Sequence, residues 1–182
     1  MHRKPLLELL QRYLESHPDE ADTARRVIDF VERHPDCFER SLKKGHITGS
    51  AWIVDSTGTK TLLTHHRKLG IWLQLGGHAD GEADVLSVAK TEAKEESGLS
   101  RLEVVSDQIF DIDVHGIPAR KDEPSHFHYD IRFLLRQTDS ETYIVSEESH
   151  DLAWVPMSDL ESRTTEWSMR RMRDKAVALL GQ

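Results

Sequence analysis

Three glutamates near the middle of the chain have the spacing of a metal-binding helix face. Glu92, Glu95 and Glu96 are related as i, i+3 and i+4, so at about 3.6 residues per turn their carboxylates leave one side of a helix. Like charges at this spacing repel, and a divalent cation would turn that repulsion into binding. Carboxylate oxygens are hard ligands that suit Mg²⁺ or Mn²⁺, and such a cation beside a phosphate bridges its oxygens and activates a water.

Glycines on either side indicate a framed loop-helix unit. Gly76 and Gly77 follow an apolar run that ends at Leu75, which predicts a tight turn leading into the helix. Gly98 stands where a C′ glycine ends a helix. The alternative interpretation is a solvated acidic helix face, and the framing glycines argue against it.

With these residues in place, the segment from Gly77 to Leu99 resembles the signature of Nudix hydrolases, G-x5-E-x7-R-E-U-x-E-E-x-G-U, where U is aliphatic. The matching positions are Gly77, Glu92, Ala93, Glu95, Glu96, Gly98 and Leu99. Two positions depart from the signature, because Ala83 replaces its first Glu and Thr91 replaces its Arg. In the family these two side chains help to hold the loop and the metal-binding glutamates.

The resemblance implies an α/β fold, the Nudix-type α/β/α sandwich with a mixed sheet. It also implies hydrolysis of a diphosphate linkage in a small nucleoside diphosphate derivative. The metal, Mg²⁺ or Mn²⁺, would be bound by Glu92, Glu95, Glu96 and the backbone carbonyl of Gly76, and Glu95 or Glu96 is the candidate base. The competing hypothesis is a non-hydrolytic Nudix-fold protein that binds a nucleotide or a partner, and the altered signature favours it.

Histidine is the second unusual feature, with eleven in 182 residues. His126 and His128 are two apart in a predicted strand, so both side chains point to the same face, a common way to offer two imidazoles to one metal. His46 opens the first predicted strand, and His78 follows the glycine pair. The alternative for each is a polar strand residue or a hydrogen-bond donor to substrate.

A weaker resemblance to isopentenyl diphosphate isomerases groups these histidines. The matching segments are His46-Ile47-Thr48-Gly49-Ser50-Ala51-Trp52, Gly77-His78 and His126-Phe127-His128, the last in place of a Glu-x-Glu strand. The resemblance implies a possible second metal site for Zn²⁺ or Mn²⁺ at His46, His78, His126 and His128. Gly76 replaces the isomerase cysteine and His128 its catalytic acid, which makes an isomerase-like enzyme the least favoured alternative.

Basic residues outside the signature are candidates for binding the substrate phosphates. Arg67 follows a histidine pair, and Arg120 and Lys121 lie in a polar segment between two predicted strands. Arginine suits this role because its guanidinium makes bidentate contacts with phosphate. Solvated loops with surface ion pairs are the equally weighted alternative. Glu147 and Glu148, ahead of a late strand, are further candidates for the general base.

Composition and charge narrow the class of protein. Lys and Arg number 24 against 32 Asp and Glu, and the net charge of −8 argues against a nucleic-acid partner. The single Cys37 forms no internal disulfide, and no apolar run is long enough for a membrane span. We therefore expect a cytoplasmic enzyme that does not act at a membrane.

Hydrophobic periodicity divides the chain into residues 1–44, a helical hairpin extension, and residues 45–182, which the resemblance implies are the Nudix domain. The extension is expected to pack on that domain or to form a homodimer contact. Helices are predicted at Pro5–Tyr13, Thr23–Arg33 and Trp167–Leu180, with a short one near Ser158–Glu161. Strands are predicted at Ile47–Val54, Thr61–Thr64, Leu102–Val105, Ile109–His115, His126–Leu135 and Leu152–Val155.

Overall fold

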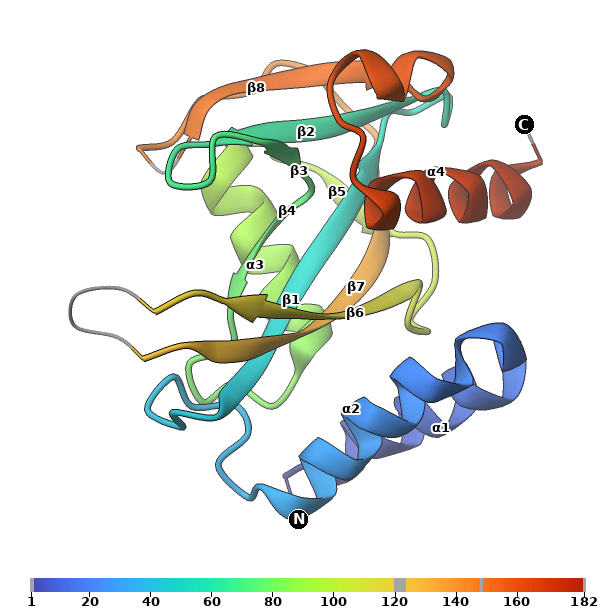
Figure 1. Cartoon of the computed structure of the whole chain (residues 1–182). Coiled ribbons are helices and arrows are strands. Elements are labelled where there is room, and N and C mark those ends of the chain that lie inside the picture. The colour runs from blue at the N-terminus through green and yellow to red at the C-terminus, as the bar shows by residue number, and fades with distance from the viewer. Residues whose placement is uncertain (1, 120–123, 148, 182) are drawn as a thin grey trace.

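A computed structural model describes residues 2–119, 124–147 and 149–181 of the chain (Figure 1). The α-helices are α1 (Lys4–Ser16), α2 (Ala21–Arg33), α3 (Val85–Ser97) and α4 (Trp167–Leu180), and short 3-10 helices occupy Pro18–Glu20 and Met157–Ser162. The strands are β1 (Gly45–Val54), β2 (Lys60–His66), β3 (Trp72–Leu73), β4 (Leu75–His78), β5 (Leu102–Val104), β6 (Asp111–Ile117), β7 (His126–Gln137) and β8 (Ser149–Pro156). Most predicted elements are thus present, with ends shifted by a few residues.

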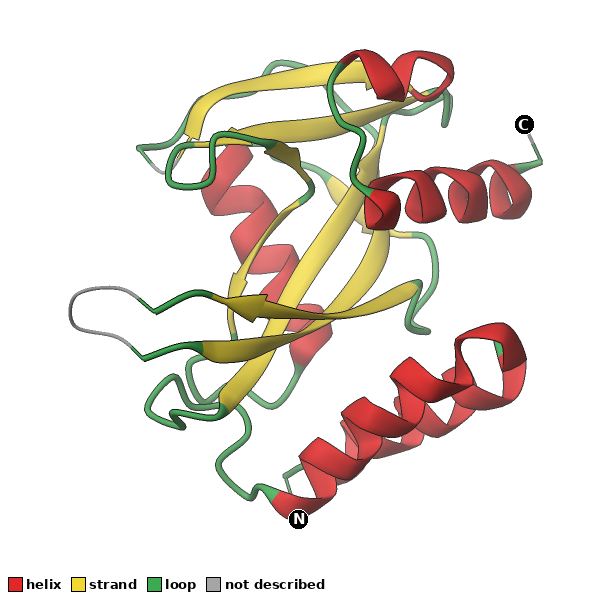
Figure 2. Ribbon diagram, viewed as in Figure 1, coloured by secondary structure: helices red, strands yellow, loops and turns green. Residues whose placement is uncertain are grey.

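The sheet is mixed, and β1 lies at its centre (Figure 2). Strand β1 runs parallel to β7 along its whole length and antiparallel to β4 and β2, which share its other edge. Strands β5 and β6 are antiparallel to β7, and β8 is antiparallel to β2. The long parallel pairing puts residues about eighty positions apart in the sequence side by side.

Helices cover both faces of the sheet, as the α/β/α sandwich requires. Every residue of β1 is buried. On one face α3 approaches β1 so closely that a side chain at Gly49 would touch Val85 and Val88, and the α1–α2 hairpin joins the same core, where Phe30 stacks on Tyr129. On the other face α4 packs its methionines against the far end of the sheet, around Trp52 and Leu134.

The tight turn predicted at Gly76 and Gly77 is wrong. Both residues lie in β4 and pair with β1, Gly76 opposite Ser50 and Gly77 opposite Gly49. The turn comes later, where Asp80 and Gly81 have positive φ angles of 50° and 88°. A pair of glycines also marks a place where other groups approach the backbone closely, and that is their role here.

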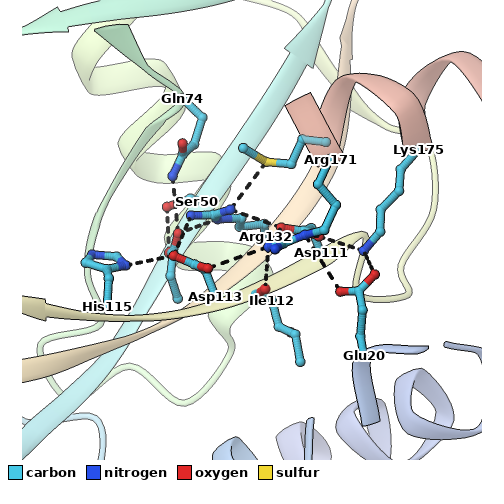
Figure 3. Close-up of polar contacts among 12 residues, drawn as sticks. Glu20, Ser50, Gln74, Asp111, Ile112, Asp113, His115, Arg132, Arg171 and Lys175 are labelled. Atoms are coloured by element: carbon cyan, nitrogen blue, oxygen red, sulfur yellow. Dashed lines mark hydrogen bonds and ion pairs between the residues drawn. The ribbon is translucent and has the colours of Figure 1, made fainter. Parts of the chain in front are cut away.

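A buried cluster of charges connects the sheet to both ends of the chain (Figure 3). Arg132 of β7 donates to Asp111 of β6 at 3.0 Å, and both side chains are almost inaccessible to solvent. From α4, Arg171 donates to Asp111 at 2.8 Å and Lys175 at 2.6 Å. Lys175 also lies 2.6 Å from Glu20, at the tip of the α1–α2 hairpin. One buried carboxylate therefore holds the C-terminal helix and, through Lys175, the N-terminal hairpin.

The acids of this cluster are ionised. Burial by itself would raise the pKa of Asp111, but hydrogen bonds from Arg171 and the charges of Arg132 and Lys175 outweigh it and lower that pKa. Burial would also raise the pKa of Asp113. The hydrogen bond from His115 and the charge of Arg132 outweigh burial and lower that pKa to about 2. Both carboxylates are therefore charged wherever the protein is folded near neutral pH.

Replacing Asp111 with Asn should lower the free energy of unfolding by about 3–5 kcal/mol, because it leaves buried cations without their counter-charge. Urea denaturation of the variant measures the loss. The control is Asp29→Asn, which removes an exposed ion pair with Arg33 and should change the free energy by less than about 1 kcal/mol. Equal effects of the two substitutions would contradict the central role of Asp111.

The lowered pKa of Asp113 predicts a pH dependence of stability. An unfolded Asp has a pKa of about 3.9, so its folded-state contribution is complete above about pH 4 and is lost as the pH falls towards about 2. Asp113→Asn should therefore lose less unfolding free energy than the wild type over this interval. Urea titrations at a series of pH values between about 2 and 5 give the two slopes, and parallel slopes would contradict the prediction.

Candidate functional site

Helix α3 presents Glu92 and Glu96 to strand β4. Its N-terminus is capped by Asp84, which accepts a hydrogen bond from the Ser87 N–H at 3.1 Å, and Gly98 ends it in the left-handed conformation, as predicted. The Gly76 N–H donates to Oε1 of Glu96 at 2.9 Å, and only 8% of Glu96 is exposed. One oxygen of this carboxylate is thus fixed by the backbone of β4.

Glu92 lies over Gly77, and the missing side chain there makes room for it. A Cβ atom at Gly77 would collide with the carboxyl group of Glu92. Glu95, on the same turn of α3, is exposed. The structure therefore brings Glu92 and Glu96 against the glycine pair of β4 and leaves Glu95 open to solvent.

The two residues that depart from the signature do not contribute charged groups. Ala83 packs against the hydrophobic core, and Thr91 is exposed. The acids beside Ala83 bond to the local backbone, because Glu82 accepts from the Asp84 N–H at 2.8 Å while Asp84 caps the helix. Backbone hydrogen bonds of Glu82 and Asp84 hold the start of this helix.

On the other face of β4 the histidines gather. Residues alternate along a strand, so His78 points away from the side on which Gly77 meets Glu92. His46 of β1 is paired with His128 of β7, and His78 of β4 is paired with Thr48, two residues along β1. The register of three strands thus brings three of the predicted histidines to one sheet face.

The three rings converge closely. Centroids of His46, His78 and His128 lie 4.9–5.1 Å apart, and one nitrogen from each lies within 4.8 Å of the others. Nε2 of His126 lies 3.3 Å from Nε2 of His128, and Nδ1 of His126 lies 3.0 Å from the carbonyl oxygen of Pro124. Two nitrogens bound to one tetrahedral Zn²⁺, each at about 2.0–2.1 Å, are separated by about 3.3 Å.

Burial keeps the central ring neutral. Desolvation and the neighbouring rings of His78 and His46 lower the pKa of His128 to about 2. A neutral imidazole is the form that donates a lone pair to a metal, so this ring is ready to act as a ligand without losing a proton.

The sequence analysis missed a fifth histidine of this group. His115 of β6 is paired with His128, their ring centroids are 5.5 Å apart, and its Nδ1 lies 3.1 Å from Oδ2 of Asp113. The alternation Asp111-x-Asp113-x-His115 resembles that of His126-x-His128 and was a usable signal. What the sequence did not contain is the register that places the two strands side by side.

The remaining predicted site residues lie elsewhere or outside the described residues. Arg67 is exposed in the loop after β2, and its Nη2 donates to the carbonyl oxygen of Ser149 at 3.0 Å. Glu147 is exposed ahead of β8. Arg120, Lys121 and Glu148 fall outside the described residues.

Comparison with known proteins identifies the class. The family model described as NUDIX domain matches residues 45–176, most of the chain, and the chain therefore belongs to the NUDIX domain family. No curated protein matches it. In the described part of the chain, no helix is long and apolar enough to span a membrane.

Solved structures similar to this chain share its fold. A Caenorhabditis elegans Ap4A hydrolase in a binary complex has a TM-score of 0.60 at 18% identity, over 74% of this chain and 97% of that chain. A NUDIX family hydrolase from Clostridium perfringens has 27% identity and a TM-score of 0.55, with the same coverage. MutT protein from Methanosarcina mazei has 17% identity and a TM-score of 0.56, over 78% and 99% of the two chains.

Gly76 and Gly77 of β4 are approached by different groups, so alanine substitutions at the two positions should have different effects. Gly77→Ala should push aside only the flexible Glu92 carboxylate, so we expect a change in unfolding free energy below about 1 kcal/mol and weaker Mn²⁺ binding. Gly76→Ala would instead overlap Ser50, including its backbone, and should cost about 1–3 kcal/mol of stability. Urea denaturation and calorimetric Mn²⁺ titration of both variants test this. Unchanged Mn²⁺ affinity in a folded Gly77→Ala protein would contradict it.

Proposed function

We propose that this protein hydrolyses a diphosphate linkage in a nucleoside diphosphate derivative, with Mg²⁺ or Mn²⁺ at Glu92, Glu95 and Glu96. The observation that carries the proposal is the placement of Glu92 and Glu96 against the glycine pair of β4, in a member of the NUDIX family. The donor set fits a hard cation, since carboxylate oxygens supply it and the missing side chain at Gly77 lets the Glu92 carboxylate lie against β4. The backbone carbonyl of Gly76 is the further ligand proposed.

A bound Mg²⁺ or Mn²⁺ supplies Lewis acidity, which neutralises diphosphate charge and makes a water more acidic. The chain supplies the geometry. The Gly76 N–H fixes the carboxylate of Glu96 before the metal binds. Glu96 therefore loses little side-chain freedom when it binds the metal. Glu95 or Glu96 takes the proton of the attacking water, and Glu95 is the one that solvent reaches.

Phosphate contacts are proposed for Arg67, Arg120 and Lys121, whose positive charges complement the substrate. Solved proteins of this fold include an Ap4A hydrolase and a dihydroneopterin triphosphate pyrophosphohydrolase, so the fold serves different substrates, and the proposed substrate is a nucleoside diphosphate derivative as a class. The enzyme is further proposed to be cytoplasmic and to form a homodimer, with residues 1–44 as an extension of the domain at 45–182.

A second metal, Zn²⁺ or Mn²⁺, is proposed at His46, His78, His126 and His128. The convergence of three of these rings and the 3.3 Å contact of the fourth with His128 support it. Imidazole nitrogens suit borderline transition metals better than Mg²⁺, so this site and the glutamate site differ in the cations they select.

The competing function is a non-hydrolytic protein that binds a nucleotide or a partner. Ala83 and Thr91 favour it, since both lack the charges of the family signature. An enzyme like isopentenyl diphosphate isomerase is less favoured, because Gly76 and His128 lack the thiol and the carboxylate of that reaction. Turnover itself separates these functions.

Glu96→Gln should lower hydrolysis of nucleoside diphosphate derivatives by roughly 100-fold or more, because it removes a charge worth several kcal/mol in the transition state. Phosphate and nucleotide release are measured over a panel of substrates with Mg²⁺ or Mn²⁺. The matched control is Glu103→Gln on the exposed side of β5, which should leave the rate unchanged.

Two results would contradict the hydrolase. Wild-type protein that is folded and binds metal yet turns over no member of the panel would favour the binding function. Retention of the rate in Glu96→Gln would remove the assigned role of Glu96 even if the wild type is active.

A further inference from the structure

We propose that His115 is a protein ligand of the metal at the histidine site and that Asp113 is the residue that positions its ring. This inference rests on the histidine metal site proposed above and is independent of the chemistry at the glutamates. It adds a strand, β6, to a site otherwise built from β1, β4 and β7.

The sheet register places His115 at the site. His115 lies directly opposite His128 in the antiparallel pair of β6 and β7, and side chains opposite each other in such a pair leave the same face with Cβ atoms about 4.5–5.5 Å apart. The two rings meet edge to face, with centroids 5.5 Å apart and an interplanar angle of 68°. His128 is itself one of the three converging histidines.

The hydrogen bond with Asp113 decides which nitrogen of His115 is available to bind the metal. A neutral imidazole carries its proton on one nitrogen, and a carboxylate accepts that proton's hydrogen bond. Asp113 lies 3.1 Å from Nδ1 of His115 and so favours the tautomer that carries its proton on Nδ1 and leaves Nε2 as the donor atom for a metal. His126 shows the same arrangement, with Nδ1 on the carbonyl oxygen of Pro124 and Nε2 at His128. Histidines that bind metals are usually oriented by such an acceptor on the other nitrogen.

Asp113 is in turn fixed by the buried charge cluster (Figure 3). Its carboxylate lies 3.4 Å from Arg132 and 3.6 Å from Arg171 of α4. The side chain of His115 is 42% exposed, so core packing alone does not define its ring orientation. The ion pairs behind Asp113 supply that definition.

The number of imidazoles determines what the metal does. Catalytic zinc sites have three protein ligands and an open position, whereas structural sites are filled by four. With His115 added to His46, His78, His126 and His128, five imidazoles are available, more than the four that fill a structural zinc site. The metal at this site therefore stabilises the four strands, and substrate chemistry stays with the glutamates on the other face of β4.

Zinc binding to the full-length protein tests the proposal. X-ray absorption at the zinc edge counts imidazole ligands, and competition with a chromophoric chelator gives the affinity. His115→Ala should lose one imidazole and at least tenfold in affinity. Asp113→Asn should keep the imidazole count and lose about 10- to 100-fold in affinity, as expected of a residue that orients a ligand. His150→Ala, at an exposed histidine of β8, is the matched control and should change neither.

The outcomes separate this inference from the proposals beneath it. If His46→Ala abolishes zinc binding while His115→Ala keeps both the ligand count and the affinity, the role of His115 is overturned and the histidine site stands. If the wild type binds no zinc, the histidine site and this inference both fail. Hydrolysis with Mg²⁺, measured on the same samples, reports separately on the glutamate site. Urea denaturation without metal shows whether each variant is folded.

Discussion

The buried pairing of Arg132 with Asp111 is the interaction on which the rest of the structure depends. Charges removed from water are tolerated only where counter-charges and hydrogen bonds surround them, and here those partners come from distant parts of the chain. Asp111 binds Arg171 and Lys175 of α4, and Lys175 reaches Glu20 of the hairpin. Satisfying one buried cluster thus fixes the position of both terminal segments against the sheet.

The same cluster extends to the polar face of the sheet, where the histidines lie. Asp130, next to Arg132 on that face, accepts hydrogen bonds from Thr48 and Ser50 of β1 and from Gln74. This carboxylate is therefore occupied by donors and is a structural group. Beyond it along the strands the sheet face changes from ion pairs to imidazoles, and burial lowers the pKa of the central one, His128, so that this ring needs no counter-charge. This change from paired charges to imidazoles lets a polar sheet face be buried without excess charge.

Imidazole and carboxylate groups lie on opposite faces of strand β4. Its alternation sends His78 to the imidazole face and leaves Gly77 towards Glu92, while the Gly76 N–H anchors Glu96. Hard carboxylates and borderline imidazoles favour different cations, so the two proposed sites would select different metals. A side chain at Gly77 would displace the carboxylate of Glu92, and a side chain at Gly76 would overlap Ser50.

The sequence by itself determined the local features of this protein. The helical period placed Glu92 and Glu96 on one face of α3, and the period of two placed His126 and His128 on one face of β7, because both depend on near neighbours in the chain. Only the tertiary structure decided that Gly76 and Gly77 form a strand and that His115 joins the histidines. Those outcomes depend on which strands pair and in which register, and that is set by packing between segments far apart in the sequence.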